Sequence, residues 1–249
     1  MAFVEEVKAE KPLPAVPRTK RGPPTLVKYY LVLYNILSAL GWSYLLLRTL
    51  TVVLNLDGSK LRPSSLVGRA AGAYAVVGAD TAIVQSFAVL EVLHVLLGWV
   101  RSPLSTTLIQ VSSRLYLVWG ITGQFSQTHT NPFYASMVLS WALTEVVRYS
   151  YYACSLLGHE SRLLVFLRYT LFYILYPTGA SSEAFLIYAT LPHPAFGLHA
   201  DLHTNVRELL FAIWWPGLYV MYTHMIKQRR KVLGGSRPAG RTGAKSKSS

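Results

Sequence analysis

The chain has 249 residues, of which 52% are hydrophobic and only 14% are charged, whereas a soluble domain carries about 25% charged residues. The net charge of +13 is concentrated at the two ends, and no basic patch interleaved with aromatic residues lies within a folded segment, which excludes a nucleic-acid-binding protein. The composition favours an integral membrane protein, and the single cysteine, Cys154, excludes an intrachain disulfide and a cysteine-based metal site.

Residues 1–26 precede the first apolar run and contain five prolines, together with more Lys and Arg than Glu. This composition predicts an extended, proline-rich basic tail outside the folded domain.

Six apolar runs follow, and each approaches or exceeds the roughly 20 residues that a helix needs to cross a bilayer. The sequence therefore predicts an all-α, polytopic membrane protein, in which residues 27–226 form a six-transmembrane-helix bundle enclosing a pocket. The expected spans are residues 27–50, 72–100, 105–122, 133–157, 163–191 and 206–226.

Residues 227–249 carry eight Lys or Arg and no acidic residue, which predicts a second basic, disordered tail. Basic flanking segments stay in the cytosol, so both tails are expected to be cytosolic, and this requires an even number of spans. Lys60, Arg62 and Arg69 disagree, because six spans place their loop on the lumenal side. Four spans, with residues 105–122 as a re-entrant segment, do not remove the conflict, and six spans are preferred.

Lys245 and Lys247 stand at the fifth and third positions from the end of the sequence. On a cytosolic tail this spacing resembles a dilysine retrieval signal, which predicts residence in the membrane of the endoplasmic reticulum. The alternative is a basic tail that only increases solubility.

A charged side chain costs roughly 2.5–3.5 kcal/mol at the centre of a bilayer and is therefore a functional candidate, and four of the expected spans carry a polar cluster. The simplest interpretation of Glu145 and Arg148 is a structural ion pair, and His94 near Glu91 fits a hydrogen bond between helices. Because each span directs its polar group inward, one buried, hydrated pocket is expected. The groups are Glu91 with His94, Gln110 with Arg114, Glu145 with Arg148 and Tyr149, and Arg168 with Tyr176 and Glu183.

The segment LYPTGASSE, residues 175–183, places a proline and a glycine inside the fifth run. Pro177 removes a backbone donor and Gly179 permits a change of direction, so the helix is expected to break here and to face the interior of the bundle. Tyr176 and Glu183 then stand at the two ends of the break, where a phenol and a carboxyl group suited to proton transfer enter one pocket.

The segment HVLLGWVRS, residues 94–102, aligns with the His-Cys-x5-Arg loop of tyrosine phosphatases. That chemistry requires a thiolate nucleophile and a loop that holds the phosphate. Val95 occupies the position of the cysteine, so phosphatase activity is rejected.

Four segments in order, LEVLHVLLGWVRSP, SRLYLVWGI, TEVVRYSYYA and RYTLFYILYPTGASSE, resemble the 3-hydroxyacyl-CoA dehydratases of the very-long-chain fatty acid elongation cycle. The resemblance covers roughly residues 29–231. It implies dehydration of (3R)-3-hydroxyacyl-CoA to trans-2-enoyl-CoA, with Tyr176 and Glu183 as the catalytic pair. Glu183 is expected to be the base and Tyr176 the proton donor, although the two roles can be exchanged, and no metal or cofactor is required.

The resemblance also implies groups that bind the substrate and proteins that act with this one. Arg148, Tyr149 or Arg114 can stabilise the thioester oxygen, and cytosolic Arg101, Arg162 and Arg168 are candidates for the CoA phosphates. Membrane lipid surrounds the bundle, and the condensing enzyme, the ketoacyl reductase and the enoyl reductase are the expected partners.

Two other functions remain open. A proton-coupled transporter can use Glu183 and Glu145 as a relay beside a broken helix, although the chain shows no inverted repeat. A catalytically inactive relative can act as a membrane scaffold for the other elongation enzymes, although the intact Tyr176 and Glu183 pair argues against this.

Overall fold

In the computed structural model, which describes residues 24–159, 161–192, 197 and 201–233, every regular element is helical. The predicted all-α fold is therefore confirmed for this part of the chain. A π-helical turn, Tyr116–Ile121, continues α5, and a short 3-10 turn, Ser126–Thr128, precedes α6. The α-helices are α1 (Thr25–Leu54), α2 (Leu66–Ala71), α3 (Ala73–Ser86), α4 (Val89–Leu96), α5 (Leu104–Leu115), α6 (Phe133–Leu157), α7 (Arg162–Arg168), α8 (Phe172–Tyr188) and α9 (Leu202–Leu233).

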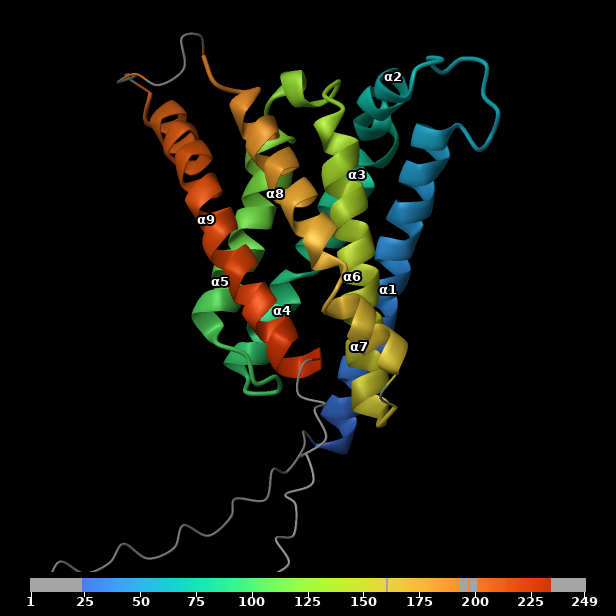
Figure 1. Cartoon of the computed structure of the whole chain (residues 1–249), viewed down its shortest axis with the longest axis vertical. Coiled ribbons are helices and arrows are strands. Elements are labelled where there is room, and N and C mark those ends of the chain that lie inside the picture. Colours follow the sequence, from blue (N-terminus) through green and yellow to red (C-terminus); the bar gives the residue numbers. More distant parts are fainter. Residues whose placement is uncertain (1–23, 160, 193–196, 198–200, 234–249) are drawn as a thin grey trace, which may run out of the picture.

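The long helices form one bundle in which consecutive passes of the chain alternate in direction (Figure 1). Helix α6 lies along both α1 and α8, and α9 packs against the other side of α8. The buried core is built mainly from α1, α3, α6 and the π-helical turn. The beginning of α1 and the end of α9 lie at the same end of the bundle (Figure 1).

Three helical stretches are long and apolar enough to cross a membrane: Thr25–Leu54, Ala73–Leu96 and Leu202–Leu233. The pair of α7 and α8, bent by 42° at its junction, is a fourth if both helices belong to one span. The protein is thus a multi-pass membrane protein. Residues 105–122 and 133–157 are helical at the expected positions, but α5 is too short to count as a span at 12 residues, and α6, which is long enough at 25 residues, is not apolar enough.

The predicted helix break at Tyr176–Pro177 is wrong, because α8 runs without interruption from Phe172 to Tyr188. The bend lies earlier, between α7 and α8. Pro177 lacks the amide hydrogen that would bond to the carbonyl four residues back, and its ring crowds that carbonyl. The distortion therefore falls on the preceding turn, where the amides of Tyr173 and Ile174 bond only three residues back, to Thr170 and Leu171.

Gly179 does not change the direction of the chain but allows α8 to approach α6. A Cβ atom at this position would lie 3.2 Å from the Cβ atom of Ser140. Two pairs of hydroxyl groups join the same surfaces: Ser140 with Thr178 at 3.0 Å, and Ser182 with Ser136 at 2.9 Å. Small and hydroxylated residues on facing helices give the close packing that membrane helices use in place of a hydrophobic driving force.

Two of the three positive charges that disagreed with the expected orientation, Arg62 and Arg69, have local partners. Arg62 forms an ion pair with Asp57 and donates to the Thr51 carbonyl, and the Nε atom of Arg69 donates to the Val53 carbonyl at 2.8 Å. Both arginines donate to carbonyl groups in the last turn of α1, and the Thr51 carbonyl also accepts from the backbone amides of Asn55 and Leu56. Their positions thus reflect helix capping.

Helix α9 continues to Leu233, past residue 227 where the C-terminal tail was expected to begin, and its last turn is basic. Lys245, Lys247 and most of the expected N-terminal tail lie outside the described residues.

Replacing Gly179 with valine should force α6 and α8 apart and lower stability by about 1–3 kcal/mol, the usual cost of overpacking. Thermal unfolding of purified protein in detergent measures the effect. Gly217→Val is the matched control, since nothing lies within 4 Å of a Cβ atom at this position of α9. Adding Ser140→Gly to Gly179→Val should restore part of the loss. Equal midpoints for the two valine variants would contradict the close contact.

Candidate active site

The carboxylate of Glu183 on α8 is held by two tryptophans from the helices on either side. Trp141 on α6 donates its indole N–H to Oε1 at 2.6 Å, and Trp214 on α9 donates to Oε2 at 3.2 Å. Each oxygen thus accepts one hydrogen bond from a side chain that can only donate. The arrangement fixes the direction of the carboxylate and leaves further lone pairs on both oxygens.

The position of Trp214 depends on how α9 meets the end of α8. Arg207 is 5% exposed and donates to the Thr190 carbonyl, just beyond α8, and to the hydroxyl of Thr204. Its guanidinium group also lies over the ring of Phe125, 4.3 Å from the centroid. This buried arginine fastens α9 to α8 near one end of the bundle, two turns from Trp214.

Tyr176 lies on the same face of α8 as Glu183. The two residues are seven apart on a continuous helix, so they are separated by about 20° around the axis and roughly 10 Å along it. Tyr176 interacts electrostatically with both Glu183 and Arg114. Among the described residues its hydroxyl has no hydrogen-bond partner, so the phenol is free to bond to a bound molecule.

Beside this pair, a network of charged groups joins α4, α5 and α6. Glu145 is 2% exposed and accepts from Arg114 and from Arg148, whose Nε lies 2.5 Å away. Arg148 also contacts Glu91 through both terminal nitrogens, at 3.0 and 2.7 Å, and the Tyr149 hydroxyl donates to Glu91 at 2.5 Å. The expected ion pair of Glu145 with Arg148 is confirmed.

The polar groups of the second, third and fourth expected spans therefore converge. His94 on α4 bonds to the hydroxyl of Tyr30 on α1 at 3.0 Å, which confirms the expected hydrogen bond between helices. The network reaches the Glu183 site through Arg114, whose guanidinium group lies over the Trp141 ring, 4.8 Å from its centroid. Arg114 also interacts electrostatically with Glu183.

The arginines expected at the cytosolic surface are not assembled into one site. The loop after α4, which carries Arg101, and the start of α7 lie at the same end of the bundle as the beginning of α1 (Figure 1). Arg101 and Arg162 are exposed, and Arg168 donates to the Tyr152 hydroxyl at 2.9 Å.

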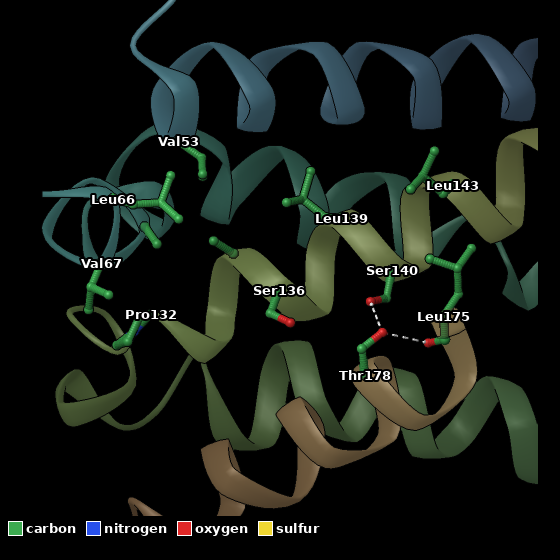
Figure 2. Close-up of a pocket in the computed structure, with 12 residues that line it drawn as sticks. Val53, Leu66, Val67, Pro132, Ser136, Leu139, Ser140, Leu143, Leu175 and Thr178 are labelled. Carbon is green, nitrogen blue, oxygen red and sulfur yellow. Dashed lines mark hydrogen bonds between the residues drawn. The ribbon is translucent and has the colours of Figure 1, made fainter. Parts of the chain in front are cut away.

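Two shallow cavities border α8, and neither is lined by Tyr176 or Glu183. One of them, about 300 Å³, is almost wholly apolar (Figure 2). The other, about 310 Å³, lies beside Pro177 and Ser181. The expected pocket around the catalytic pair is therefore neither of these cavities. The apolar cavity is lined by Val53, Leu66, Val67, Ala70, Pro132, Ala135, Ser136, Leu139, Ser140, Leu143, Leu175 and Thr178.

Trp141 and Trp214 are not among the site residues that the sequence predicts. One signal pointed to them: an indole N–H within an apolar span requires an acceptor, and Glu183 is among the few acceptors there. In the segment that resembles the phosphatase loop, Val95 lies within helix α4 and not in a loop.

Comparison with known proteins places the site in a family. The chain matches the family described as "Protein tyrosine phosphatase-like protein, PTPLA" over residues 85–235. No solved structure matches the chain.

Curated relatives match most of the chain. A protein of Schizosaccharomyces pombe named "Probable very-long-chain (3R)-3-hydroxyacyl-CoA dehydratase" is 40% identical over 82% of this chain and 92% of its own length. The dehydratase hpo-8 of Caenorhabditis elegans is 38% identical over 84% of this chain and 96% of its own. PASTICCINO 2 of Arabidopsis thaliana, which has the same enzyme name, is 34% identical over 84% and 95%. The chain, with its carboxylate held between two tryptophans, belongs to the PTPLA family.

Proposed function

We propose that this protein is a very-long-chain (3R)-3-hydroxyacyl-CoA dehydratase, which removes water to give trans-2-enoyl-CoA in the third step of fatty acid elongation. Relatives that bear this enzyme name match more than four fifths of the chain. The observation that carries the proposal is the pairing of an anchored Glu183 carboxylate with an unbonded Tyr176 phenol on one face of α8.

Glu183 is the base in this proposal. Both of its oxygens accept hydrogen bonds from indole groups, and these bonds favour the ionised carboxylate, which carries the negative charge that they stabilise. The carboxylate removes the proton from C2 of the substrate. The C3–O bond then breaks, and Tyr176 donates its proton to the leaving hydroxyl, which departs as water. Proton transfer from Glu183 back to Tyr176 restores both groups, and no cofactor takes part.

Arg114 stabilises the negative charge that develops on the thioester oxygen. Among the expected candidates, Arg148 already donates to carboxylates through all three nitrogens, and Tyr149 is bonded to Glu91. Arg114 uses only one terminal nitrogen for Glu145 within the described part of the chain, and its side chain is 26% exposed. Its remaining donors are therefore available to a substrate.

The membrane arrangement that we propose has six spans. Helices α5 and α6 are two of them, in addition to the three candidate spans and the bent pair of α7 and α8. These helices alternate in direction with the others, and the beginning of α1 and the end of α9 share one end of the bundle (Figure 1). Both termini are cytosolic in this arrangement. Arg101, Arg162 and Arg168 then lie on the cytosolic side, where they can bind the CoA phosphates.

Lys245 and Lys247 hold the protein in the endoplasmic reticulum, together with the condensing enzyme and the two reductases of the elongation cycle. The transporter alternative loses support, because Glu145 is paired with two arginines and is not available as a proton relay.

Tyr176→Phe removes one hydroxyl and Glu183→Gln removes the ability to ionise, so both variants should insert and fold normally. Each should lower turnover of a long-chain 3-hydroxyacyl-CoA by at least about 100-fold, the usual contribution of a general acid or base. The double variant should lose far less than the product of the two losses, because both groups serve one transition state. Tyr173→Phe, the same change on the same helix, is the control. Near wild-type turnover in both single variants would contradict the assignment of Tyr176 and Glu183 and would favour the alternative of a catalytically inactive scaffold.

In sealed microsomes, added protease should remove tags from both termini, whereas a protease site inserted at Gly58 should be protected. This pattern follows from six spans with the loop between α1 and α2 in the lumen. Permeabilising the microsomes with detergent should expose the inserted site, which shows that it can be cut. Protection of either terminus, or cleavage at Gly58 in sealed vesicles, would contradict the proposed arrangement.

A further inference from the structure

We propose that Trp141 and Trp214 are positioning residues for the reaction, which they serve by holding the Glu183 carboxylate in one orientation. This inference rests on the proposed function, because it requires Glu183 to be the base. Neither tryptophan acts on the substrate itself. Their indole N–H groups determine where the lone pairs of the carboxylate point.

The two bonds come from opposite sides of α8, and this restricts the carboxylate more than either bond alone. Trp141 belongs to α6 and Trp214 to α9, while Glu183 stands on the helix between them. Turning the carboxylate about its last side-chain bond would stretch both hydrogen bonds together. A base must lie within hydrogen-bonding distance of the proton that it removes. A carboxylate that is held in one orientation meets this condition in a larger fraction of enzyme–substrate complexes.

Trp141 is itself held in place. Its side chain is 2% exposed, its ring meets that of Trp42 edge to face with centroids 6.3 Å apart, and Arg114 covers one face. Arg114 is in turn paired with Glu145, which is buried in the charged network. The charged network thus acts on Glu183 indirectly: Arg114 holds the Trp141 ring, and Trp141 donates to the carboxylate.

Trp214 is less constrained, and its hydrogen bond to Glu183 is longer, 3.2 Å against 2.6 Å. Its place depends on the packing of α9 against α8, which Arg207 fastens at one end. We therefore expect Trp141 to contribute more than Trp214.

Trp141→Phe and Trp214→Phe each keep an aromatic ring and remove one donor. We expect kcat to fall about 10–100-fold for Trp141→Phe, the usual cost of losing a hydrogen bond to a charged group, and several-fold for Trp214→Phe. KM should change less than about threefold in both, because neither ring binds substrate. Trp215→Phe is the matched control: Trp215 neighbours Trp214 but packs on Phe185 and Phe211, and its replacement should leave kcat within about twofold.

The same changes in a Glu183→Gln background separate positioning from general packing. Trp141→Phe should cause little further loss there, because the carboxylate that it orients is already absent. Thermal unfolding identifies a variant that does not fold, in which case Trp214→Phe carries the test. Equal losses with and without Glu183, or wild-type kcat in both tryptophan variants while Glu183→Gln is impaired, would overturn the inference alone. Wild-type turnover by Glu183→Gln would instead overturn the proposed function.

Discussion

The rest of the structure depends on one constraint: a carboxylate in an apolar bundle needs donors, because the interior of a membrane offers no water to supply them. Glu183 meets this requirement by accepting one hydrogen bond from α6 and one from α9. The three helices must therefore keep a fixed spacing. The absent side chain of Gly179, the paired hydroxyl groups and buried Arg207 each maintain that spacing.

The charged network of α4, α5 and α6 also supplies partners for buried charges, but it does so within itself. Glu91, Arg148, Glu145 and Arg114 satisfy one another almost completely, so most of this network is structural. Of these four residues, Arg114 alone keeps unused donors within the described part of the chain, and it interacts electrostatically with both Tyr176 and Glu183. Trp141 is the place where the two systems meet, since its ring contacts Arg114 and its N–H contacts Glu183. The buried charge network and the Glu183 carboxylate are thus joined through the side chain of Trp141.

Much of this organisation could be predicted from the sequence, because apolar runs and charged residues inside them are local signals. The six helical regions and the ion pair of Glu145 with Arg148 belong to this group, whereas the shared face of Tyr176 and Glu183 follows from the uninterrupted α8. The bend was misplaced because the effect of Pro177 falls on the preceding turn while packing preserves the helix around it. The tryptophan donors could not be assigned, since the acceptor of an indole depends on which helices become neighbours.

The most direct test of the account is dehydration by the purified protein, with a long-chain (3R)-3-hydroxyacyl-CoA as substrate and mass spectrometry of the products. The account predicts that the wild-type protein forms trans-2-enoyl-CoA without added metal or nucleotide, and that a folded Glu183→Gln protein forms it at least about 100-fold more slowly. No product from folded wild-type protein, or equal rates from both proteins, would contradict it.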